Sequence, residues 1–246
     1  MLRVACLLFS LISITAFAKD RFLLSSELGA VEASENGSFS SLEAEYLEYQ
    51  NFSLGMHYQS DTRIFLEDEK VLDSRVGIQG STKLPGTWNY RWRFSLGQQE
   101  NIFATFSLSN EFRWRWKDFN IQLGLNHYEY EILGSIQEGS VGTDYRINKK
   151  IKVGGKLNVS NTTPTANNFE FSGQYRLKQW ELEAEYDVGK VVEADGVVAD
   201  RNSYDFKAYY NFKVNKSYLK IAPAYQYYDG TVRDEQRFYF SFIGAF

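Results

Sequence analysis

Apolar and polar residues alternate along most of this chain with a period of two. Segment 87–97 is a clear example, since its even-numbered positions carry the apolar residues Trp88, Tyr90, Trp92, Phe94 and Leu96. Side chains of a β-strand point alternately to its two faces, so the pattern predicts strands with one apolar and one polar face. The same alternation is found in segments 102–116, 151–160, 180–192 and 202–214.

Turn-forming residues divide the chain into fourteen predicted strands. Their ranges are 21–32, 38–49, 52–60, 73–84, 87–97, 102–116, 119–134, 141–147, 151–160, 169–177, 180–192, 202–214, 218–228 and 235–246. Every second connection is tight, as at Gln50-Asn51 or Pro85-Gly86, and those in between are mostly longer and polar. Short turns at one rim and longer loops at the other are typical of transmembrane β-barrels. The sequence therefore predicts an all-β fold, a transmembrane antiparallel up-and-down β-barrel of fourteen strands. Twelve strands is the alternative within an open range of about ten to sixteen.

The last predicted strand is the most apolar, and Phe238, Phe240, Phe242, Gly244 and Phe246 share one of its faces. This segment resembles the final strand of Gram-negative outer-membrane β-barrel proteins, whose aromatic C-terminus is read during assembly. The resemblance implies that Phe238, Phe240, Phe242 and Phe246 form a C-terminal assembly signal. It also implies localisation in the outer membrane of a Gram-negative bacterium, with the barrel-assembly machinery and periplasmic chaperones as partners.

Residues 1–18 have the features of a secretory signal peptide: one cation (Arg3), an apolar run, and Ala16-Phe17-Ala18 as a cleavage site. An N-terminal membrane anchor is the alternative, but the apolar run falls short of the roughly 20 residues that a spanning helix needs. The single cysteine, Cys6, lies in this segment and precedes most of the apolar run, which excludes a lipoprotein. We expect residues 19–246 to form one outer-membrane β-barrel domain without disulfide bonds.

The aromatic content of 17% is high, and Trp and Tyr concentrate near the ends of the predicted strands. A soluble β-sandwich or a small ligand-binding barrel would also alternate, with its apolar face inside. So many aromatic side chains would overfill such a core, whereas girdles of aromatic residues at both lipid interfaces are expected of a membrane barrel. The expected girdle residues are Trp88, Trp114, Trp116, Tyr128, Tyr130, Trp180, Tyr218 and Tyr227. The outer face would contact outer-membrane lipid and lipopolysaccharide.

The polar faces carry charges in two groups. The predicted basic cluster of the lumen comprises Arg75, Lys83, Arg91, Arg93, Arg113 and Arg115. The predicted acidic ladder comprises Glu43, Glu45, Glu181, Glu183, Glu185 and Asp187. A basic wall opposite an acidic wall would set a transverse field across a water-filled lumen, which favours polar over apolar solutes.

This arrangement predicts a porin-like channel for the passive diffusion of small polar or charged solutes, with residues 61–72 as the candidate constriction. In the alternative, the charges pair with one another and the barrel is a closed, non-conducting structural or lipid-interacting protein. The short chain and the arginine-rich lumen strands are similar to the small monomeric sugar-acid porins. That resemblance implies a monomer, although the acidic ladder departs from an anion-selective lining.

Two irregularities interrupt the pattern. The apolar phase slips near Asn126-His127, which predicts a β-bulge, and Pro223 lies inside a strand. Neither His57 nor His127 belongs to a His-x-Ser pair, so we expect no enzyme, and His57 should be a hydrogen-bonding lumen residue. Acidic loop segments such as Glu67-Asp68-Glu69 are interpreted as solvated, so no metal or cofactor is expected. The net charge of −4 gives no support for nucleic-acid binding.

Overall fold

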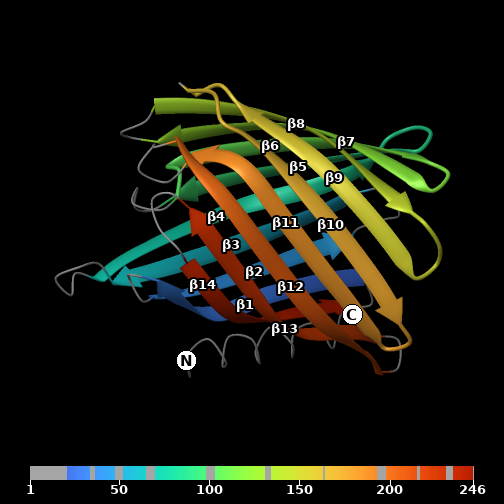
Figure 1. Cartoon of the computed structure of the whole chain (residues 1–246). Coiled ribbons are helices and arrows are strands. Elements are labelled where there is room, and N and C mark those ends of the chain that lie inside the picture. Colours follow the sequence, from blue (N-terminus) through green and yellow to red (C-terminus); the bar gives the residue numbers. More distant parts are fainter. Residues whose placement is uncertain are drawn as a thin grey trace.

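Fourteen antiparallel strands close into a barrel in the computed structural model of this chain (Figure 1). The structure describes residues 21–33, 37–47, 52–64, 70–97, 103–130, 134–162, 164–192, 198–214, 217–230 and 235–245. The strands are β1 (Arg21–Ala33), β2 (Gly37–Leu47), β3 (Phe52–Ile64), β4 (Lys70–Lys83), β5 (Trp88–Gly97), β6 (Phe106–Trp116), β7 (Phe119–Tyr130), β8 (Gly134–Arg146), β9 (Ile151–Ser160), β10 (Asn167–Leu177), β11 (Trp180–Val192), β12 (Val198–Val214), β13 (Ser217–Gly230) and β14 (Glu235–Ala245). The predicted strand number and the all-β barrel architecture are confirmed.

Each strand is hydrogen-bonded to its neighbours in the sequence, and β1 pairs with β14 to close the ring. The closing register aligns Leu23 with Ala245 and Leu28 with Phe240. A closed sheet has no edge strand, so no row of backbone donors and acceptors is left open to another chain. No helix long and apolar enough to cross a membrane occurs among the described residues.

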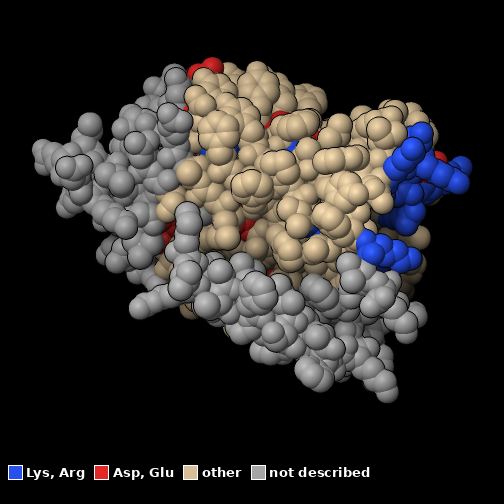
Figure 2. Space-filling view, turned by 90° about the horizontal axis from the view of Figure 1, so that it is seen from below, with Lys and Arg blue, Asp and Glu red and all other residues tan. Residues whose placement is uncertain are grey.

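Most of the large apolar side chains in the described residues lie on the outside of the barrel. Outward residues such as Met56 and Phe240 are 63% and 64% exposed, and Figure 2 shows an outer wall made mostly of uncharged side chains. The side chains buried most completely include polar ones, among them Asp73, Ser53 and Ser95. This arrangement is the reverse of a soluble β-sandwich, whose apolar face would lie inside, and an apolar outer wall matches a transmembrane barrel.

The predicted β-bulge at Asn126-His127 is wrong. β7 keeps one continuous register against β6, with Ser109 opposite Asn126 and Ser107 opposite Tyr128. It is also continuous against β8, which begins at Gly134 rather than at residue 141 and therefore pairs with β7 as far as Tyr130. The alternation of apolar residues shifts for another reason: Tyr128, an aromatic residue, lies on the interior face.

His127 consequently points outward, where its ring lies 5.9 Å from that of Phe106. Pro223 causes no bulge either, because β12 and β13 keep the same offset on both sides of it, at Lys207–Ala224 and Tyr210–Ile221. Three of the eight expected girdle residues are misplaced: by register, Tyr128, Tyr130 and Tyr218 face the interior. A tyrosine can occupy a polar face because its hydroxyl forms hydrogen bonds there.

We expect Gly77→Ala to destabilise the barrel by about 1–3 kcal/mol, because a Cβ at this position would lie 2.0 Å from the Phe94 carbonyl oxygen and 2.5 Å from the His57 ring. Gly139→Ala is the matched control, since no atom lies within 4 Å of its Cβ position. Urea unfolding of both variants, followed by tryptophan fluorescence, measures the difference. Equal unfolding midpoints would contradict the prediction.

Candidate functional site: the charged interior

Two cavities lie inside the barrel among the described residues. The larger, about 480 Å³, is here called the basic cavity, because four cations face two carboxylates in its lining. These six are Arg91, Arg93, Arg113, Lys156, Glu43 and Glu111. The smaller, about 270 Å³, is the acidic cavity, in which three cations face five carboxylates. These eight are Arg113, Lys152, Lys207, Asp144, Glu170, Glu183, Glu185 and Asp205.

Arg113 borders both cavities. It is held by an ion pair with Glu111, two residues earlier on β6. Strand alternation places both side chains on the same face, and the pairing leaves the guanidinium between a net positive and a net negative compartment. The interior is therefore divided by charge, with Arg113 at the boundary.

Part of the predicted basic cluster meets part of the acidic ladder. Arg91, Arg93 and Arg113 line the basic cavity together with Glu43. The Arg93 guanidinium on β5 is 2.7 Å from the Glu43 carboxylate on β2, so this ion pair reaches across the two intervening strands β3 and β4. Both side chains are about one-third exposed, and an ion pair that is partly solvated contributes only modestly to stability.

The remaining predicted residues lie elsewhere. Lys83 and Arg115 are exposed at the short-turn end, and Arg75 is hydrogen-bonded to Gln59 nearer the other end. Glu183 and Glu185 line the acidic cavity, and Asp187 accepts a hydrogen bond from Ser203. On β14, Phe238 and Phe240 are exposed on the outer face, with Phe242 on the same face. The side chain of Glu45 and the whole of Phe246 are outside the described residues.

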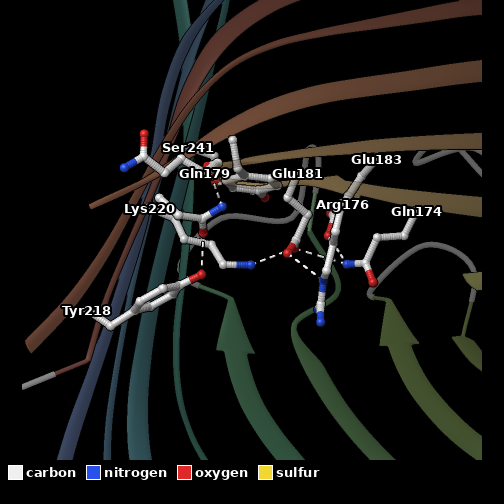
Figure 3. A network of polar contacts seen from close by, with 10 residues as sticks. Gln174, Arg176, Gln179, Glu181, Glu183, Tyr218, Lys220 and Ser241 are labelled. Atoms are coloured by element: carbon white, nitrogen blue, oxygen red, sulfur yellow. Dashed lines mark hydrogen bonds and ion pairs between the residues drawn. The ribbon is translucent and has the colours of Figure 1, made fainter. Parts of the chain in front are cut away.

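Glu181 is 3% exposed and is the centre of a polar network (Figure 3). Its carboxylate is 2.5 Å from Lys220 Nζ on β13 and 2.8 Å from Arg176 Nε on β10. Gln174 donates hydrogen bonds to both Glu181 and Glu183, at 3.0 and 2.8 Å. The acidic ladder is therefore not a uniform row of free carboxylates, because Glu181 is neutralised by two cations.

A second network joins the closing strands, and no pattern in the sequence predicted it. Lys207 Nζ is 3.1 Å from Glu27 on β1 and 3.7 Å from Asp205. The Tyr239 hydroxyl donates to Asp205 at 2.9 Å, and Lys207 Nζ lies 5.2 Å from the centre of the Tyr239 ring. These residues belong to β1, β12 and β14, so the polar contacts brace the seam of the barrel from inside.

Phe103, which lies between β5 and β6 in the sequence, is buried against interior side chains of β4. Its backbone N–H donates to the Asp73 carboxylate at 2.8 Å, and the Arg75 guanidinium lies 4.9 Å from the centre of its ring. The predicted constriction at 61–72 is only partly described. Residues 61–64 and 70–72 extend β3 and β4, and the intervening residues are outside the described ranges. Outside the strands, Phe103 and Ala104 are buried, at 8% and 7% exposed.

His57 on β3 reaches over Gly77 to Ser95 on β5, with 2.8 Å between Nε2 and Oγ. Both side chains are buried, at 4% and 2% exposed, and Nδ1 has no hydrogen-bond partner in the described structure. Nucleophilic catalysis needs a group that orients the imidazole and a path for the substrate to the hydroxyl. Among the described residues no group orients the imidazole through Nδ1, and the Ser95 side chain is buried, so the geometry is that of a structural contact within the wall.

Glu170, Glu185 and Asp187 bring carboxylate oxygens within 4.8 Å of one another beside the acidic cavity. By distance alone the three could hold a cation. Lys156 already places its ammonium group 3.6 Å from Glu170, which offsets part of the negative charge. The cluster therefore adds to the field of the acidic cavity without defining a metal centre.

The fold has counterparts among solved structures. The CymD monoaromatic hydrocarbon channel superposes with a TM-score of 0.64 at 6% identity, over 93% of this chain and 88% of that one. A mutant of the Rh. blastica porin has a TM-score of 0.49 at 10% identity, covering 92% and 99%. OmpF of Salmonella typhi has 0.48 at 9%, covering 90% and 96%. No family model and no curated protein matches the sequence. The likeness to CymD shows a shared barrel fold, and the solute must be argued from the residues.

Glu181→Ala is expected to destabilise the barrel by about 2 kcal/mol, since it leaves Lys220 and Arg176 without their buried counter-charge. Glu183→Ala, two residues along the same strand, removes a hydrogen bond from Gln174 but no ion pair within the described residues, and it should cost about 1 kcal/mol or less. Equilibrium unfolding in urea compares the two. A Glu183 variant as unstable as the Glu181 variant would refute the central role of Glu181.

Proposed function

We propose that this protein is a porin-like channel in the outer membrane of a Gram-negative bacterium, which passes small polar or charged solutes by passive diffusion. The observation that carries the proposal is the charged interior: two cavities of about 480 and 270 Å³, lined by side chains of both signs, inside a closed barrel with an apolar outer wall. Water-filled space between fixed opposite charges favours polar solutes and disfavours apolar ones.

The same features support a proposed cellular location and a proposed set of partners. The apolar wall would contact membrane lipid and lipopolysaccharide, residues 1–18 would direct export, and the phenylalanines of β14 would be read by the barrel-assembly machinery after delivery by periplasmic chaperones. The channel would act as a monomer, without a cofactor and without catalytic activity. The buried His57–Ser95 pair, which lacks an orienting carboxylate among the described residues, supports the last point.

A closed structural barrel is the second candidate function, and specific contacts favour it. Arg93–Glu43 and Lys207–Glu27 join strands that are not neighbours, so both ion pairs occupy interior space. Charges paired in this way could fill the lumen instead of lining a pore. Conductance distinguishes the two candidates directly.

The purified protein in a planar bilayer should give stable single-channel steps. Arg91→Ala/Arg93→Ala should shift the reversal potential in a salt gradient towards cations, since removing two lining cations changes the energy of a passing ion by about 1 kcal/mol, or about fivefold in permeability ratio. Lys149→Ala/Lys150→Ala is the control with equal loss of charge, because both lysines lie on an exposed turn. In 1 M salt the screening length is about 3 Å, so the charges on that turn should not affect a passing ion. A folded, heat-modifiable barrel that never conducts would overturn the channel and leave the closed barrel.

Phe103→Ala should raise the single-channel conductance, because it removes a large ring that packs against the interior Arg75 guanidinium. Phe106→Ala is a matched control, since Phe106 lies three residues later and packs on the outer face against Phe94. The same single-channel recordings give both values. Unchanged conductance in Phe103→Ala would show that this ring is not part of the narrowest passage.

A further inference from the structure

The short-turn rim of the barrel is strongly basic on one side. Besides Arg176, which is paired with Glu181, the ends and turns of β6 to β11 expose six cations, Arg115, Lys117, Arg146, Lys149, Lys150 and Lys178, and the turns there carry one acid, Asp118. None of the six forms an ion pair within the described part of the chain. Figure 2 shows Lys and Arg gathered at one end of the molecule, and in Figure 1 these turns lie at that end.

Two of these cations occupy backbone positions that do not suit a lysine. Lys117 and Lys178 have φ values of 54° and 53° and are the first residues of two-residue turns. Glycine or asparagine adopts this left-handed conformation at lower cost. The turns therefore carry a cation at a place where the backbone alone would favour another residue.

Directly above the rim, a row of aromatic rings marks the outer wall. Trp88 stacks on Trp114, Trp114 on Trp116, and Phe119 on Tyr145, with ring centres 5.9, 6.2 and 4.5 Å apart. Aromatic rows of this kind lie at the level of lipid headgroups. The basic turns, immediately beyond the row, are then at the depth of the lipid phosphates.

The same part of the wall is hollowed. An apolar cavity of about 540 Å³, here called the outer groove, lies over Thr143 and Gly155 and is bordered by Trp116, Phe119, Leu157 and Phe171. Gly155 leaves the space open, since a Cβ there would have no neighbour closer than 3.8 Å. The groove meets the basic rim at Trp116, over whose ring Lys117 places its ammonium group at 5.3 Å.

We propose that the outer groove and the adjacent turns bind one anionic glycerophospholipid, such as phosphatidylglycerol. An acyl chain lies in the groove, and the phosphate is held by Lys117, Lys149 and Lys150. Charge complementarity selects the occupant: the groove fits any acyl chain, but cations without counter-charge at headgroup depth favour a lipid with net negative charge over a zwitterionic one. The inference concerns the outer wall and does not depend on whether the lumen conducts.

The test is native mass spectrometry of the protein released from mild detergent, with equimolar phosphatidylglycerol and phosphatidylcholine of identical acyl chains. Wild type should retain one phosphatidylglycerol with at least about tenfold preference. Lys117→Gln/Lys149→Gln/Lys150→Gln should bring the preference close to unity. The matched control, Lys83→Gln/Lys190→Gln/Lys213→Gln, removes equal charge from exposed positions on β4, β11 and β12 and should keep the preference.

A substitution that fills the outer groove tests the binding of the acyl chain separately from the binding of the phosphate charge. Gly155→Leu should abolish the retained lipid, whereas Gly139→Leu, another outward glycine with open space outside the groove, should not. Equal retention of the two lipids by wild type, or equal loss of preference in the two lysine triples, would overturn the proposal. Displacement of phosphatidylglycerol by equimolar lipopolysaccharide would also overturn it, since the rim would then bind a different phosphate carrier.

Discussion

Closure of the backbone hydrogen-bond ladder between β1 and β14 is the constraint on which the rest of the structure depends. In a membrane no water is present to satisfy an open strand edge, so a sheet can cross only as a closed ring. Closure fixes which face of every strand is inside, because a shift of one residue would turn each side chain to the other face. The apolar wall, the charged interior and the two rims all follow from that single register.

The charged side chains inside a closed barrel need counter-charges or hydrogen-bond partners. The structure uses three arrangements: local pairs such as Arg113–Glu111, pairs between non-neighbouring strands such as Arg93–Glu43, and the network around Glu181. Each satisfies charged groups in a confined space, where an unpaired charge would be costly. The residual imbalance is not uniform, and it is what distinguishes the basic cavity from the acidic one.

The sequence predicted the strands well because two independent signals coincide: period-two alternation within strands and turn residues between them. It predicted β5 or β11 almost to the residue. It failed where a signal was ambiguous, as at Tyr128, which resembles a lipid-facing aromatic residue but faces inward, and at β8, whose glycine-rich start lacks alternation. The sequence could not predict the interior contacts, because alternation shows on which face a side chain lies but not which other strand a long side chain reaches. Nothing in the local sequence links Lys207 to Glu27 or Phe103 to Asp73.

The position of Arg113 on the boundary of both cavities has a consequence for the evolution of the protein. A guanidinium that borders two compartments is exposed to the charge of each, so we expect substitutions on β5 and on β11 to be energetically coupled through it, although the two strands are not neighbours. Residues that are coupled through a shared cavity wall have non-additive effects. The two walls should therefore not evolve independently: the effect of a substitution in one wall would depend on which residues are present in the other.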